Sequence, residues 1–177
     1  MYALADAKIE IVFSLDNITK TVGIFGGRGS SSLWNTCSFF FIAYSTSYFR
    51  FDRAGQDTIA NSSSITIDDT SIFHFLYEGR NTQFINLITK EIIDTDIGNA
   101  SSFPSVSLCL FAVNSNGNVG NQMTGRIYRW RYWEGGVLKQ DFYPVRVGED
   151  GYMYDKVSGV LFSNQGTGEF IIGPDKE

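Results

Sequence analysis

The heptapeptide IYRWRYW, residues 127–133, holds the densest group of side chains suited to recognising a ligand. Side chains of an extended strand alternate between its two faces. One face would then carry only aromatic rings, from Tyr128, Trp130 and Tyr132. The other would carry Arg129, Arg131 and Trp133. We therefore expect the first face in the core and the second at a surface.

The mixed Arg/Trp face leaves two interpretations open. Arg129 and Arg131 could pair with carboxylates on neighbouring strands, which would make the face structural. Alternatively, the face is a ligand platform, because an exposed indole offers a flat apolar surface to a sugar ring and Arg supplies fixed donors. The candidate carbohydrate-binding residues are then Arg129, Arg131, Trp133 and, from a serine-rich segment upstream, Trp34.

Other reactive groups give weaker signals. His74 is the only histidine and has no cluster of His or Cys around it, so we expect a hydrogen-bonded ring on a strand. The sequence contains no tight alternation of Glu and Asp of the kind that would suggest glycoside cleavage. The acidic residues at 68–69 and 94–96 are typical of turns, and neither run has a full calcium-loop pattern. We expect no catalytic residue, metal or cofactor, with Ca²⁺ as the open alternative.

Two further features are interpreted as structural. The run GIFGGRGSSS, residues 23–32, lacks the Gly-Lys-Ser/Thr ending of a phosphate loop and precedes no helix, so it predicts a glycine-rich connection between strands. Cys37 and Cys109 lie in apolar, strand-like runs without metal spacing. They predict buried free thiols, with a disulfide as the less favoured alternative.

Length, net charge and the lengths of apolar runs limit the number of domains and the kinds of partner that we expect. With 177 residues the chain suits one domain, residues 1–177, and Met1 just before a strand suggests that this domain is excised from a longer chain. The formal net charge of −5 argues against a nucleic-acid partner. No apolar run approaches the roughly 20 residues of a membrane helix, so membrane insertion is not expected.

Hydrophobic periodicity predicts strands from end to end. The segment KIEIVFSL, residues 8–15, alternates apolar and polar positions, and about a dozen similar segments follow it. Turn formers such as Asn116-Gly117 and Gly135-Gly136 separate them. No segment sustains helical spacing. The pattern predicts an all-β domain, either an antiparallel two-sheet sandwich or a closed barrel.

The C-terminal third carries a recognisable series of motifs. Residues 125–174 run from the strand GRIYRWRYWE through DFYPV and YDKVSG to FSNQGTGEF. This series resembles the closing segment of concanavalin A-like (laminin-G-like) jelly-roll modules of phage tail and gut-bacterial surface proteins. The usual opening segment of those modules is absent apart from Tyr2, as an excised domain would show. The matching residues are Ile127, Tyr128, Gly135, Asp141, Phe142, Pro144, Tyr154, Asp155, Gly159, Asn164, Gly166, Gly168 and Phe170.

Most of these matching residues serve the fold. We expect Asp141 and Asp155 to accept backbone N–H groups at turns, and Phe142 and Phe170 to lie in the core. The resemblance therefore implies an antiparallel jelly-roll β-sandwich but says little about the ligand.

The function implied by the resemblance is non-catalytic recognition. The expected partners are a cell-surface glycan and other domains or subunits of a larger assembly, at a virion surface or a bacterial cell surface. A phage tail or fibre, or a bacterial surface protein, would be the parent. The alternatives are a structural, adhesion or virion-decoration module that binds protein, and a glycan-cleaving enzyme on the same fold.

Overall fold

A computed structural model describes residues 6–16, 19–29, 38–44, 48–53, 56–57, 70–79, 81–97, 106–165 and 170. These residues form fifteen strands and no helix. The strands are β1 (Lys8–Leu15), β2 (Val22–Arg28), β3 (Ser38–Tyr44), β4 (Tyr48–Arg53), β5 (Gln56–Asp57), β6 (Phe73–Glu78), β7 (Asn81–Asn86), β8 (Ile92–Ile97), β9 (Cys109–Leu110), β10 (Val113–Ser115), β11 (Asn118–Gly120), β12 (Gly125–Glu134), β13 (Val137–Val147), β14 (Asp150–Asp155) and β15 (Leu161–Phe162).

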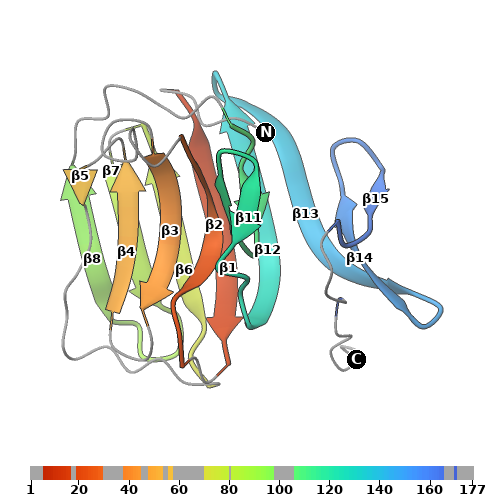
Figure 1. The fold of residues 1–177 in the computed structure, drawn as a ribbon, viewed down its shortest axis with the longest axis horizontal. Coiled ribbons are helices and arrows are strands. Elements are labelled where there is room, and N and C mark those ends of the chain that lie inside the picture. Colours follow the sequence, from red (N-terminus) through yellow and green to blue (C-terminus); the bar gives the residue numbers. More distant parts are fainter. Residues whose placement is uncertain are drawn as a thin grey trace.

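Two sheets share these strands, and they overlap in Figure 1. The eight-stranded sheet has the order β15-β14-β13-β12-β1-β6-β7-β8. The seven-stranded sheet has the order β11-β10-β2-β3-β4-β5, with β9 also paired to β2. Every pairing is antiparallel except that of β10 with β2. The prediction of an all-β, mainly antiparallel two-sheet architecture is confirmed.

Aromatic side chains join the sheets into a β-sandwich. The rings of Phe41, from β3, and Phe75, from β6, stack with centroids 4.5 Å apart. Phe25, from β2, meets Trp130, from β12, edge-on at 5.3 Å. Such pairs contribute beyond the burial of their area, and large rings dominate the hydrophobic stabilisation of a core. Period-two alternation in β1 delivers its apolar side chains to this core, as the sequence predicts.

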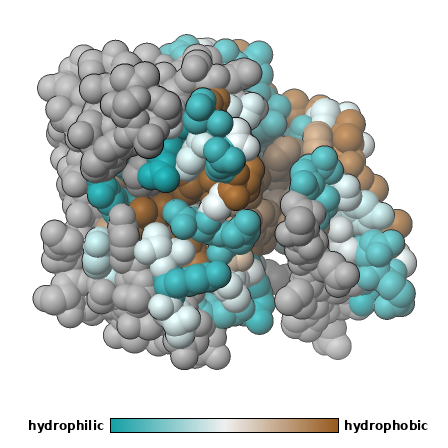
Figure 2. Space-filling view, in the orientation of Figure 1, coloured by the Kyte–Doolittle hydropathy of each residue, from teal (hydrophilic) through white to brown (hydrophobic). Residues whose placement is uncertain are grey.

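The eight-stranded sheet extends beyond the sandwich. In Figure 1, β14 and β15 stand to the right of the region where the sheets overlap. The ring of Phe142, in β13, packs against Phe162, in β15, with centroids 5.3 Å apart. Several apolar side chains of this extension stay exposed, and Figure 2 shows hydrophobic surface there. They are Val147, Val157, Val160, Leu161 and Phe162.

The glycine-rich run is largely strand, which corrects the prediction of a connection at residues 23–32. Residues 23–28 belong to β2 of the seven-stranded sheet, and all of them except Arg28 are buried. A Cβ atom at Gly23 would come within 2.8 Å of Val113 Cγ2, and one at Gly27 within 3.1 Å of Val106 Cγ2. A side chain at Gly23 would collide with Val113 and the backbone of Ala112, and one at Gly27 would press on Val106 and Leu108. Such close approach is a packing requirement that composition alone does not reveal.

Two other segments differ from the pattern of the sequence. The apolar run VSLCLFAVN, residues 106–114, has the composition of a single strand but forms two short ones, β9 and β10, because Phe111 between them adopts φ 63°. This left-handed conformation is uncommon for a bulky residue and reverses the chain. Residues 94–96 lie within β8 and not in a turn.

Cys109 is a free thiol but only half-buried, and burial raises the pKa of that thiol.

Candidate functional site

The candidate site is the outer face of the eight-stranded sheet, the face turned away from the aromatic core. Antiparallel pairing of β6, β1 and β12 aligns polar side chains in rows across this face. The rows are Glu78–Lys8–Trp133, Leu76–Glu10–Arg131 and His74–Val12–Arg129. Directly opposed side chains on one face lie close enough to interact. The predicted Arg/Trp face of residues 127–133 is therefore confirmed as part of this surface.

Glu10 lies at the centre of the outer face. Its Oε1 atom lies 3.2 Å from His74 Nε2, and its Oε2 atom forms an ion pair with Arg131. The hydrogen bond from His74, together with the Arg131 guanidinium, outweighs the effect of burial and lowers the pKa of Glu10 to about 2. His74 therefore has the hydrogen-bonded strand position that the sequence predicts, and Glu10 is an anion that holds two neighbours in place.

Arg129 is held by Asp141 on β13. Nε and Nη2 of Arg129 donate to the two carboxylate oxygens of Asp141, each at 3.1 Å. This bidentate geometry raises the pKa of Arg129. The prediction that Asp141 accepts backbone N–H groups at a turn is wrong: Asp141 points to the outer face and binds a side chain. The predicted pairing of both arginines with carboxylates is confirmed, since Asp141 pairs with Arg129 and Glu10 with Arg131.

Trp133 is partly exposed, as predicted, and lies between cations. Lys8 Nζ is 5.2 Å and Arg131 Cζ is 5.3 Å from the centre of the indole ring. Lys8 also forms an ion pair with Glu78 at 3.1 Å. Cations near an indole face are attracted by its quadrupole, so the ring is held in a defined orientation while keeping accessible surface.

Tyr128 does not lie in the core, which corrects the prediction for the first face of this strand. Trp130 and Tyr132 are buried as predicted, but the pairing of β12 with β1 shifts at Tyr128. This bulge turns Ile127 into the core and places the Tyr128 hydroxyl 3.2 Å from Ser14 Oγ. One extra residue in a strand reverses the alternation beyond it.

Tyr143 and Lys156 are members of the outer face that the sequence interpretation missed. Tyr143 follows Asp141 by two residues in β13, and that period-two spacing was the available signal. Lys156 Nζ lies 4.0 Å from the centre of the Tyr143 ring, and Arg129 Cζ lies 4.8 Å from it. Tyr154 of β14 is the residue directly opposite Tyr143.

Asp155 is the structural carboxylate that the sequence predicts. It is buried and accepts the backbone N–H of Asp141 at 2.9 Å and that of Val157 at 3.1 Å. Ser158 adds its hydroxyl at 2.7 Å. Burial opposes ionisation of Asp155, but these hydrogen bonds outweigh it and lower the pKa. The carboxylate thus fixes the turn that carries Lys156.

The four candidate carbohydrate-binding residues have different outcomes. Arg129, Arg131 and Trp133 meet on the outer face, whereas Trp34 lies outside the described residues. Cys37, one of the two predicted free thiols, also lies outside them.

Within the described part of the chain, no group of His, Cys, Asp or Glu has the arrangement of a metal site. The same part contains no helix long and apolar enough to cross a membrane.

No protein-family model, curated protein or solved structure matches the chain.

Proposed function

We propose that the chain is a non-catalytic recognition module that binds carbohydrate on the outer face of its eight-stranded sheet. Trp133 would stack on a sugar ring, and Arg129 and Arg131 would orient hydroxyl groups beside it. Trp34 is proposed as a second stacking residue on the strength of the sequence alone. Stacking by an aromatic ring with a few fixed polar groups is how small, polar ligands are held on protein surfaces.

One observation supports this proposal most: Trp133 keeps an accessible ring while Lys8 and Arg131 lie within 5.3 Å of its centre. A ring already oriented loses little conformational freedom when it binds a ligand. The carboxylates of Glu10 and Asp141 likewise hold the arginine side chains, so the donors beside the ring are ordered in advance.

The electrostatics of Glu10 and Asp155 suit a scaffold role and not that of a catalytic acid. A glycan-cleaving enzyme needs a carboxylic acid whose pKa is raised, so that it is protonated near neutral pH. Glu10 has a pKa of about 2, and the pKa of Asp155 is also lowered. Both groups are ionised near neutral pH and engaged by neighbours, which suits a scaffold role.

The finer assignment of fold and setting is part of the same proposal. A two-sheet β-sandwich is compatible with the jelly-roll, concanavalin A-like topology that residues 125–174 suggest. The chain would then be one module of a phage tail or fibre, or of a bacterial surface protein, acting at a virion or cell surface. Calcium could assist ligand binding there.

A glycan-array screen, run with and without calcium, tests the proposal. We expect wild-type protein to bind a restricted set of glycans and Trp133→Ala to lose at least half of that signal while remaining folded. Val119→Ala is the matched control, because Val119 is exposed on β11 of the other sheet. Absence of glycan binding, or equal binding by Trp133→Ala, would contradict the proposal.

A protein-binding adhesion or decoration module is the second candidate. The exposed apolar side chains of Val157, Val160, Leu161 and Phe162 at the sheet extension favour it, because apolar groups gathered at a surface often mark a protein interface. A Leu161→Asp, Phe162→Asp double variant that loses association with the parent assembly, but still binds glycan normally, would assign this region to protein contact.

A further inference from the structure

A continuous chain of contacts across three strands joins His74 to Trp133, the proposed stacking residue. His74 Nε2, on β6, lies 3.2 Å from Glu10 Oε1, on β1. The other carboxylate oxygen of Glu10 forms an ion pair with Arg131, on β12. The guanidinium carbon of Arg131 lies 5.3 Å from the centre of the Trp133 ring. A change at His74 therefore has a short route, through two side chains, to the proposed ligand surface.

The two arginines of the outer face are held to different degrees. Arg129 donates through Nε and Nη2 to both carboxylate oxygens of Asp141. Arg131 pairs with Glu10 through Nη2, and within the described part of the chain its buried Nε atom has no hydrogen-bond partner. Two parallel bonds fix a guanidinium more firmly than contact at one end. The position of Arg131 therefore depends on how firmly Glu10 is itself held.

We propose that His74 is a positioning residue of the Trp133 surface and makes ligand binding there dependent on pH. The inference rests on the proposed function, because it concerns the regulation of the same site. An ionised carboxylate only accepts hydrogen bonds, so the neutral His74 ring donates through Nε2 and takes up a further proton at Nδ1. Protonation keeps the bond to Glu10 and makes it charge-assisted, which roughly doubles its strength. Glu10, and through it Arg131, is then held more firmly at acidic pH.

The surroundings of His74 make Glu10 its ionic partner. Val12 of β1 and Ile85 of β7 are the residues directly opposite His74, and both are apolar. Among the described residues, the charged groups in the same or the next row of the neighbouring strands are Glu10, Arg129 and Arg131. Asp141 already neutralises Arg129.

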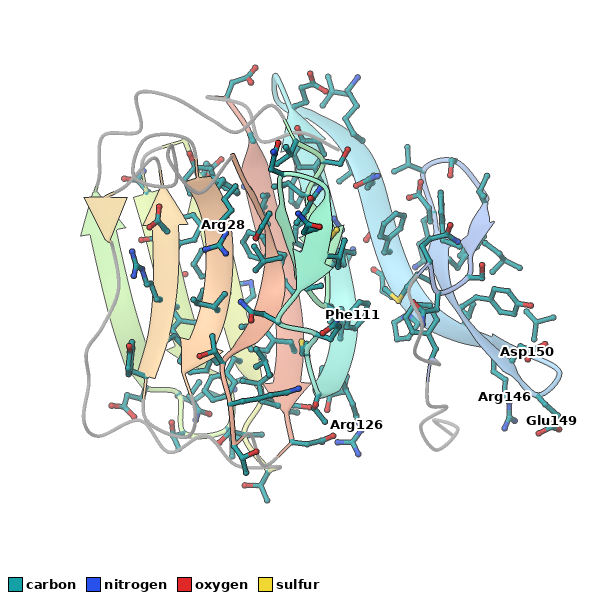
Figure 3. All side chains as sticks on the ribbon, in the orientation of Figure 1. Arg28, Phe111, Arg126, Arg146, Glu149 and Asp150 are labelled. Carbon is teal, nitrogen blue, oxygen red and sulfur yellow. The ribbon has the colours of Figure 1, made fainter. Side chains whose placement is uncertain are left out.

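The His74 side chain is 21% exposed, so water reaches the ring and can deliver the proton. Other charged groups lie farther away. Arg126 points away from the sandwich at the start of β12 in Figure 3, and it pairs with Asp16 at 3.6 Å. The tip of the β13–β14 hairpin, well away from the sandwich in Figure 3, carries Arg146, Glu149 and Asp150.

The first experiment follows the indole N–H signals of the tryptophans by NMR between about pH 8 and about pH 5, the range in which a histidine changes charge. His74 is the only histidine of the chain, so a change that disappears in His74→Gln has a single source. We expect the Trp133 signal to shift in wild type and to stay constant in His74→Gln, whose amide keeps an N–H donor but does not titrate. The Trp130 signal, from the buried face, is the internal control and should stay constant in both proteins.

His74→Phe, which keeps a ring but removes the donor, tests positioning apart from titration. At about pH 8, still within the range in which a histidine changes charge, its Trp133 signal should differ from wild type, whereas that of His74→Gln should resemble it. The hydrogen bond from His74 is the largest cause of the lowered pKa of Glu10, so His74→Phe should also raise that pKa from about 2 towards 4.5. If His74→Phe does not fold, the pH profile of His74→Gln still decides.

A glycan array run at both pH values separates this inference from the proposed function. For glycans that wild type binds, we expect affinity at the acidic pH to be higher by up to about fivefold, the size of one partly exposed charge pair, and His74→Gln to bind equally at both. Glycan binding through Trp133 with a Trp133 signal that ignores pH would overturn the role of His74 and leave the recognition module intact. A Trp133 signal that depends on pH through His74, without glycan binding at either pH, would support the positioning role and overturn carbohydrate as the ligand.

Discussion

Trp130 and Trp133 lie three residues apart in β12 and occupy opposite environments. Trp130 is fully buried and packs against Phe25 across the sandwich. Trp133 is partly exposed and lies between Lys8 and Arg131 on the outer face. Tryptophan therefore packs in the core on one face of β12 and keeps accessible ring surface on the other. Substitutions that distinguish these roles separate folding from ligand binding.

Different interactions stabilise the two faces of the eight-stranded sheet. The inner face depends on shape and on removal of apolar area from water, which pH and salt change little. The outer face depends on pairs such as Arg129–Asp141 and Arg131–Glu10, which respond to protonation and to ionic strength. Substitutions on the inner face should therefore change the free energy of unfolding more than substitutions on the outer face.

Trp130→Ala should give the largest effect, a loss of about 3–5 kcal/mol in the free energy of unfolding, because it removes a fully buried indole from a dense aromatic core. Urea denaturation followed by circular dichroism measures it. Trp130→Phe, which keeps a ring against Phe25, should lose much less. An unchanged midpoint for Trp130→Ala would contradict the assignment of this face to the core.

Asp155→Ala should follow, with a loss of about 1–3 kcal/mol, because it leaves the buried N–H of Asp141 and the Ser158 hydroxyl without their acceptor. Thermal unfolding monitors the change. Asp150→Ala, on the exposed hairpin tip, is the control and should stay within about 0.5 kcal/mol of wild type. A variant of Asp155 with normal stability but no ligand binding would make this carboxylate part of the site.

Glu10→Gln tests the outer face through pH and should cost about 1 kcal/mol near neutral pH, between the effects of exposed and buried pairs. The pKa of Glu10 falls from 4.5 to about 2 on folding, so its ionised form stabilises the fold. That contribution is present above pH 4.5 and disappears as pH falls from 4.5 towards 2. The difference in the free energy of unfolding between wild type and Glu10→Gln should vanish over the same pH range. A difference that stays constant with pH would contradict a stabilising role for the ionised Glu10 carboxylate.

Strand positions were largely predictable, whereas the details of pairing were not. Residues 8–15 and 125–134 form strands with the predicted bounds, because alternation and flanking turn residues are local signals. The bulge at Tyr128 depends on how β12 aligns with β1, and the strand conformation of Gly23 and Gly27 depends on what packs above them. Both are contacts between segments distant in sequence.

The candidate site was predictable in part for the same reason. The grouping of Arg129, Arg131 and Trp133 follows from period two within a single strand. Their partners could not be identified, because pairing with Glu10 and Asp141 requires the register of three strands. Lys156 lies in the turn directly after β14, where no periodic pattern predicts the direction of a side chain.

Trp133→Ala should have the smallest effect on folding, below about 1 kcal/mol, because it removes only cation–π contacts and partly exposed area. Its effect on ligand binding should exceed that, since the proposed stacking surface is lost. Acrylamide quenching of single-tryptophan variants compares the two environments directly. The Trp133 signal should be quenched readily and the Trp130 signal protected; the reverse would mean that the ligand platform lies on the opposite face of β12.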